Sequence, residues 1–180
     1  MARQRLDPGV AVLLGEGPPH RAQERRVIPT GPPGFRLRFY PGVRPEARQL
    51  LKDFAAWLRR RVDFRHPVRV TVVPHATVVG LDGAPGWAVF LIPPDDHGRA
   101  DVVRIFVAAG SAEVRRRRFG YGWSAALRDL AHDLAHEVVH YEQWRDGRAV
   151  DERNVNRRAA ALVARYLVER GGAAGAGVAA

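Results

Sequence analysis

A long helix with an apolar stripe is the feature of this sequence that most constrains its fold. Residues 124–145 begin at Ser124, a typical N-cap residue, and are followed by Gly147, a typical stop signal. Between these ends, large apolar residues recur every three or four positions: Leu127, Leu130, Leu134, Val138 and Tyr141. Alanines beside the stripe widen it, so we expect a helix that is buried over most of its middle.

His136 and His140 lie on this helix, with Glu137 between them. Residues four apart share a helix face, so the two imidazoles can bind one metal ion. Glu137 projects near the open position of such an ion, where a carboxylate can accept a proton from bound water. We expect zinc, because it accepts imidazole nitrogen and lowers the pKa of its water to near neutrality. The alternative is a pair of hydrogen-bonded histidines in a buried core.

A third ligand is expected on a second helix, over residues 151–170. Its apolar residues share one stripe: Val155, Ala159, Leu162 and Tyr166. Glu152 falls at the start of this stripe, so it should face the first helix across a short turn. A carboxylate there would complete a site of two histidines and one glutamate, with the fourth position left to water. Asn156, one helical turn later, is placed to hold a ligating imidazole by its other ring nitrogen.

Each of these assignments has an alternative. Glu152 is also typical of an ordinary acidic residue in the first turn of a helix, where the macrodipole favours it. His132 and Asp133 form an overlapping motif with the same spacing, but Asp is one methylene shorter than Glu and reaches a metal-bound water less well. We therefore interpret His132 as a core histidine, with a proton shuttle or a substrate contact as the other options. The weaker candidates for the third ligand are Asp151 and Glu142.

The pattern His136-Glu137-x-x-His140 followed by Glu152-x-x-x-Asn156 resembles the gluzincin metallopeptidases, the class of thermolysin. This resemblance covers residues 124–167. It implies that the two histidines and Glu152 bind zinc and that Glu137 is the general base. In that family an acid four residues after the third ligand orients a histidine, whereas this sequence has Asn156 there. The gap from His140 to Glu152 is shorter than in thermolysin and looks more like that of the very small gluzincins of compact prokaryotic domains.

The rest of the chain predicts an N-terminal helix and a small sheet. Residues 45–62 have apolar residues at helical spacing, and three strand-like runs follow: Val68–Val73, Trp87–Ile92 and Val102–Ala108. With the two later helices, this order predicts an α+β domain whose small sheet of three to four strands is mostly antiparallel. The resemblance implies a zincin-like layout, in which the strand before the metal helix lies at the sheet edge and pairs with an extended substrate. Val102–Ala108 holds that position here.

Composition favours one small domain. Residues 1–34 are rich in Pro, Gly and Arg and predict a flexible arm, residues 35–170 predict the domain, and residues 171–180 predict a disordered, low-complexity tail. A chain of 180 residues with 46% hydrophobic content can bury a single core. The lack of cysteine excludes disulfides and thiolate ligands. We expect a cytoplasmic protein without a membrane partner, because no apolar run resembles a signal peptide or a membrane span.

The formal net charge of +10 favours acidic partners and non-specific contact with nucleic acid. The densest basic run is Arg115–Arg118, which is followed by Phe119, Tyr121 and Trp123. Cations beside aromatic rings can bind phosphate and stack bases. We favour the alternative, a solvated loop whose aromatic residues pack on the core.

The sequence therefore predicts a zinc-dependent metallopeptidase-like hydrolase that cleaves a peptide or protein substrate through a metal-activated water. Glu137 would take the proton of that water and deliver it to the leaving amine. An oxyanion donor is also expected, and its candidates are Tyr121, His132 and Tyr141. The alternatives are a catalytically inactive metal-binding scaffold, a basic nucleic-acid-associated protein and a regulatory peptidase of a mobile element. The substrate and the oligomeric state stay open.

Overall fold

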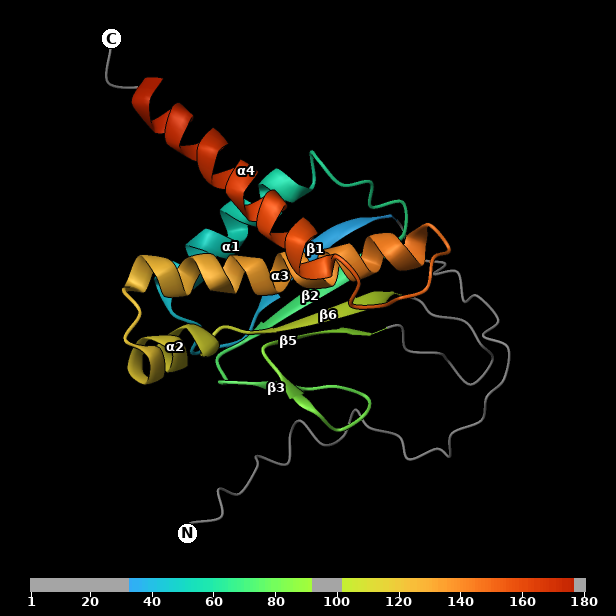
Figure 1. Cartoon of the computed structure of the whole chain (residues 1–180), viewed down its shortest axis with the longest axis horizontal. Coiled ribbons are helices and arrows are strands. Elements are labelled where there is room, and N and C mark those ends of the chain that lie inside the picture. The colour runs from blue at the N-terminus through green and yellow to red at the C-terminus, as the bar shows by residue number, and fades with distance from the viewer. Residues whose placement is uncertain (1–32, 92–101, 177–180) are drawn as a thin grey trace.

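Helices cover one face of a small sheet in the computed structural model, which describes residues 33–91 and 102–176 (Figure 1). In chain order the elements are β1 (Gly34–Phe39), α1 (Pro45–Leu58), β2 (Pro67–Val73), β3 (Val78–Val79), β4 (Pro85–Gly86), β5 (Ala88–Leu91), β6 (Val103–Ala108), α2 (Ser111–Phe119), α3 (Trp123–Arg145) and α4 (Val155–Ala176). The α+β class expected from the sequence is confirmed. In the described residues, no helix has the length and apolar content needed to cross a membrane.

The main sheet has the strand order β1-β2-β6-β5. Its β1–β2 and β2–β6 pairs are parallel, and only the β5–β6 pair is antiparallel. The prediction of a mostly antiparallel sheet is therefore wrong. No strand was predicted over the residues of β1. Helix α1 connects β1 to β2, and a connection through a helix is the kind that gives parallel pairing. Residues 1–32 of the predicted arm lie outside the described residues.

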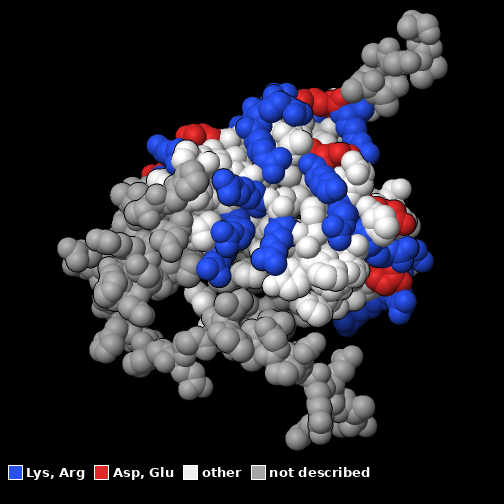
Figure 2. All heavy atoms as spheres, turned by 180° about the vertical axis from the view of Figure 1, so that it is seen from behind, with Lys and Arg blue, Asp and Glu red and all other residues white. Residues whose placement is uncertain are grey.

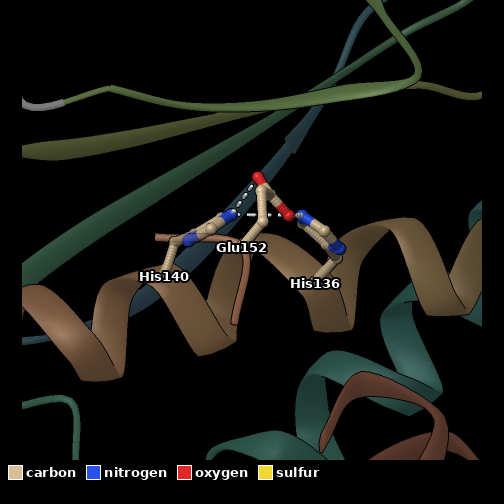
Figure 3. Close-up of side chains that lie close together, drawn as sticks. All are labelled: His136, His140 and Glu152. Carbon is tan, nitrogen blue, oxygen red and sulfur yellow. Dashed lines mark hydrogen bonds and ion pairs between the residues drawn. The ribbon is translucent and has the colours of Figure 1, made fainter. Parts of the chain in front are cut away.

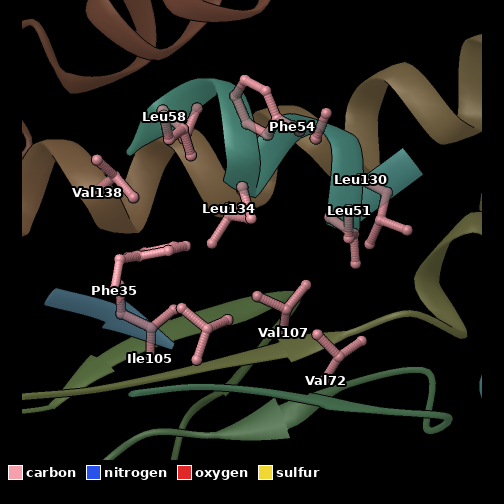
Figure 4. Packing of buried hydrophobic residues seen from close by; sticks show 14 of the residues in the cluster. Phe35, Leu51, Phe54, Leu58, Val72, Ile105, Val107, Leu130, Leu134 and Val138 are labelled. Atoms are coloured by element: carbon pink, nitrogen blue, oxygen red, sulfur yellow. The ribbon is translucent and has the colours of Figure 1, made fainter. Parts of the chain in front are cut away.

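Regular alternation along the strands builds the core between sheet and helices (Figure 4). Every second residue of β1, β2 and β6 faces the helices, as in Val68, Val70 and Val72 of β2. Helices α1 and α3 contribute large apolar side chains from the other side: Leu51, Phe54, Leu58, Leu130, Leu134 and Val138. These side chains are almost fully buried, and each contributes about 1.5–3 kcal/mol of hydrophobic stabilisation. Helix α3 is thereby held rigidly over the sheet.

Helix α3 begins slightly earlier than the sequence suggests. Its N-cap is Gly122, so Ser124 lies in the first turn and the predicted N-cap is wrong. The helix ends at Arg145, and Gly147 follows with a φ of 72°, as expected of a stop signal.

Helix α4 differs more from its prediction. It begins at Val155 and continues to Ala176, beyond the expected end at Arg170, so residues 171–176 of the predicted tail are helical. Residues 177–180 lie outside the described residues. Glu152 precedes the helix, in a turn where Asn154 adopts a left-handed φ of 62°. The expectation that Glu152 lies on the helix face is therefore wrong.

Three further expectations need correction. Val102–Ala108 was expected at the sheet edge, but β6 lies between β2 and β5, and β5 is the edge strand beside α3. The run Arg115–Arg118 is not a loop, because it lies within α2, which is capped by Gly120 with a φ of 67°. Arginine is a good helix former, and a glycine in the left-handed conformation is a common helix end. Helix α1 also ends at Leu58, a turn before the expected Val62.

Candidate metal centre

The structure brings His136, His140 and Glu152 together (Figure 3). The two histidines project from α3, one turn apart, and Glu152 reaches them from the turn before α4. The Nε2 atoms of the histidines are 3.1 Å apart. The Glu152 carboxylate lies 3.3 Å from Nε2 of His136 and 3.2 Å from Nε2 of His140. Among the described residues, this is the one group of three that could hold a metal ion.

Amide side chains hold both imidazoles by the nitrogen that faces away from Glu152. Asn156 Oδ1 lies 3.1 Å from Nδ1 of His136, and Gln143 Oε1 lies 3.0 Å from Nδ1 of His140. Gln143 is itself fixed, because its Nε2 donates to the carbonyl oxygen of Asp151 at 2.9 Å. An amide oxygen only accepts, so each Nδ1 carries the proton and each Nε2 of a neutral ring presents its lone pair.

This arrangement fits a metal ion well. The two Nε2 atoms are 3.1 Å apart, and their lone pairs repel each other and the nearby carboxylate unless a cation lies between them. Ligand atoms at the corners of a tetrahedron, with bonds of about 2.0–2.1 Å to the ion, lie about 3.3 Å apart. The separations of 3.1, 3.2 and 3.3 Å match this value. Burial, together with the neighbouring His140, lowers the pKa of His136, which favours the neutral ring that a metal requires.

Glu137 lies beside the three residues in a pocket of about 480 Å³. Its side chain is buried, and the pocket is also lined by His132, His136 and Asn156. Burial raises the pKa of Glu137 to about 8, and the carboxylates of Glu152 and Asp133 act in the same direction. A backbone hydrogen bond at Phe90 opposes them. A carboxylate with a raised pKa in a pocket is suited to accept and release a proton near neutral pH.

Arg115 is one of the residues that line the pocket, a position that was not predicted from the sequence. Its guanidinium donates to both carboxylate oxygens of Asp133, at 2.8 and 2.9 Å, and lies 3.8 Å from the ring centroid of Trp87. Burial raises the pKa of Asp133, although the hydrogen bonds from Arg115 oppose this rise. Because Asp133 is occupied by Arg115, the geometry favours Glu137 over Asp133 as the acid of the motif. No local signal marks one arginine of the run Arg115–Arg118 as buried.

Gln143 was also missed, although a signal existed. It lies three residues after His140 and therefore on the same helix face, where an amide can reach the ring nitrogen.

The two weaker ligand candidates lie outside the cluster. Glu142 pairs with Arg158 at 2.7 Å, and the carboxylate of Asp151 accepts from the backbone of Arg153.

The three oxyanion candidates separate clearly. His132 lines the pocket, with its Nε2 3.3 Å from the carbonyl oxygen of Asn156. Tyr141 is buried and its hydroxyl donates to the carbonyl oxygen of Asp63, away from the pocket. Tyr121 is exposed beside Phe119 after α2 and does not line the pocket. Only His132 stays a candidate.

Neither the protein-family models nor the curated proteins compared with this chain match it. A function must therefore be inferred from the chemistry of the centre. That chemistry consists of two imidazole nitrogens and a carboxylate at one point, and a second carboxylate in the adjoining pocket.

Proposed function

We propose that this chain is a zinc-dependent hydrolase of the metallopeptidase type. The observation that carries the proposal is the convergence of His136, His140 and Glu152, with Glu137 in the pocket beside them. Hydrolytic zinc sites use three protein ligands of these types and leave a fourth position to water. A structural zinc site would instead be closed by a fourth protein ligand. The gluzincin resemblance of the sequence supports the same interpretation.

The residues of the pocket would divide the chemistry between them. Zinc, when bound, polarises a carbonyl group and lowers the pKa of its water to near 7. Glu137 accepts a proton from water and delivers it to the leaving nitrogen, and its raised pKa suits both steps. Asn156 and Gln143 hold the imidazoles in the required tautomer. His132 lines the same pocket and could donate a hydrogen bond to the oxygen that becomes negatively charged if its Nε2–H turned from the carbonyl oxygen of Asn156.

An extended peptide is the substrate that the surrounding structure favours. Strand β5 is the edge of the main sheet, lies beside α3, and so has one row of backbone groups outside the sheet. Its Phe90 ring lies 6.3 Å from the ring of His140, so the strand runs past the proposed metal position. A peptide added to β5 as a further strand would cross the centre. The role that the resemblance gave to Val102–Ala108 is therefore assigned to β5.

Metal analysis combined with a peptide-library cleavage assay tests the proposal. We expect about one zinc per chain after purification without chelator, and loss of zinc in the His136→Ala/His140→Ala variant. Glu137→Gln keeps the shape of the side chain but cannot accept a proton, so it should bind zinc normally while cleavage falls at least ~100-fold. Stoichiometric zinc in the double histidine variant would exclude this centre. Undiminished cleavage by Glu137→Gln would exclude the mechanism, and zinc binding without any cleavage would identify a scaffold.

A further inference from the structure

Arginine side chains extend from the β1 edge of the main sheet across β2 to β6, whereas the candidate metal centre lies on α3 beside β5. Figure 2 shows the molecule from behind, where Lys and Arg side chains far outnumber Asp and Glu side chains. We name as the basic edge six residues of this region: Arg36 and Arg38 of β1, Arg69 of β2, Arg104 of β6, and Arg48 and Arg59 at α1.

Three of these arginines form a row across the sheet. Arg36 is in register with Arg69, and Arg69 with Arg104. Neighbouring strands lie about 4.8 Å apart, so the row is about 10 Å long. The residues on either side of each arginine along its strand pack into the core, which places the row on the face of the sheet away from the helices. Arg38 lies on the same face, 5.5 Å from the ring centroid of Tyr40.

Arg48 of α1 and Arg59, which caps this helix, lie at the β1 edge beside the row. Arg59 Nε donates to the carbonyl oxygen of Phe35 at 2.8 Å, and Arg48 Nη2 donates to that of Tyr40 at 3.5 Å. Neither contact neutralises the charge. Among the described residues, no Asp or Glu lies within salt-bridge distance of any of the six arginines. Within the described residues, the buried Nε of Arg104 has no hydrogen-bond partner.

A row of this kind is unfavourable for the folded chain alone. Like charges directly opposite one another on neighbouring strands destabilise a sheet. A bound anion with several negative charges at regular spacing would remove the repulsion and satisfy the free guanidinium donors. Guanidinium groups suit phosphate in particular, because they donate two parallel hydrogen bonds to it.

We infer that the basic edge binds the phosphate backbone of nucleic acid. A row of three guanidinium groups about 10 Å long can contact successive phosphates of one strand. Tyr40, 45% exposed beside Arg38, offers an aromatic face to a base. A membrane surface fits less well, because interfacial binding requires several apolar side chains that insert between lipids. In the described part of this region, Tyr40 is the one exposed large hydrophobic residue.

Binding of labelled duplex and single-stranded DNA to the full chain, measured by fluorescence anisotropy over a range of salt concentrations, tests the inference. The variant Arg36→Gln/Arg69→Gln/Arg104→Gln should bind at least ~10-fold more weakly at moderate salt, with a log–log salt slope lower by about 2 to 3. Its melting temperature should equal or exceed that of the parent, because the repulsion within the row is removed. That second measurement separates lost contacts from lost folding.

The matched control is Arg116→Gln/Arg118→Gln/Arg128→Gln, which removes the same charge from exposed positions of α2 and α3. It should weaken binding far less than the first variant. His136→Ala should bind DNA like the parent. A failure of this inference can therefore be distinguished from a failure of the proposed hydrolase function. An equal or larger loss in the control would overturn the inference in favour of diffuse charge or of the α2 arginines. Absence of DNA binding by the parent, or tighter binding to phosphatidylserine vesicles than to DNA, would also overturn it.

Discussion

Arginines have different surroundings near the candidate metal centre and at the basic edge. Around the metal centre they are paired: Arg115 with Asp133 at 2.8 Å, and Arg158 with Glu142 at 2.7 Å. At the basic edge, Arg36 and its neighbours have no carboxylate partner among the described residues. The paired arginines shape and fix a pocket, whereas the unpaired ones keep their hydrogen-bonding capacity available to a partner. The net charge of +10 is therefore divided unevenly over the surface.

Removing Arg115 should give the largest effect on stability. Arg115→Ala leaves the Asp133 carboxylate buried without a partner, which costs about 3–5 kcal/mol of the free energy of unfolding. Arg69→Ala removes an exposed arginine that has no carboxylate partner among the described residues, and the free energy of unfolding should change by less than about 0.5 kcal/mol. Urea unfolding followed by circular dichroism measures both. Equal effects would mean that pairing does not distinguish the two regions.

Glu152→Ala should give the next largest effect, on the metal rather than on the fold. The side chain is 72% exposed, so its loss should change stability little in metal-free protein. Loss of an anionic ligand should weaken zinc affinity about 100-fold, or about 2.7 kcal/mol, and abolish turnover. Zinc titration with a competing chelator measures the affinity. Glu142→Ala is the control, and a similar loss of zinc affinity there would refute the role of Glu152.

The pH dependence of stability should show a gradual effect that comes from the buried Glu137. In metal-free protein the pKa of Glu137 is raised from 4.5 to about 8, so between these values the folded chain holds a proton that the unfolded chain releases. The free energy of unfolding therefore falls as pH rises through this interval, by at most about 1.4 kcal/mol per pH unit. Glu137→Gln lacks this proton and should gain stability relative to the parent as pH increases. Urea unfolding at a series of pH values tests this, and a constant difference would contradict it.

Local patterns predicted much of the centre. The spacing of the apolar residues identified α3, and the i, i+4 rule placed His136 and His140 on one face. The reason given for Glu152 is corrected by the structure, because it reaches His136 and His140 from a turn rather than from a helix face.

Features that depend on distant partners could not be predicted in this way. The parallel pairing of β1 with β2 follows from a crossover through α1, and nothing in Gly34–Phe39 alone specifies it. The burial of Arg115 depends on Asp133, which is 18 residues away and on another helix. The edge position of β5 likewise depends on how the whole sheet is ordered.

The position of Glu152 on a connection makes the centre a link between two helices. His136 and His140 belong to a helix buried in the core, whereas Glu152 and Asn156 arrive with the turn and the start of α4. A bound ion would connect these segments, and its binding free energy would stabilise the packing of α4 against α3. Metal binding would then affect not only the chemistry of the pocket but also how often the turn that carries Glu152 separates from α3. A chain deprived of metal would keep α3 in place and open first at residues 148–154.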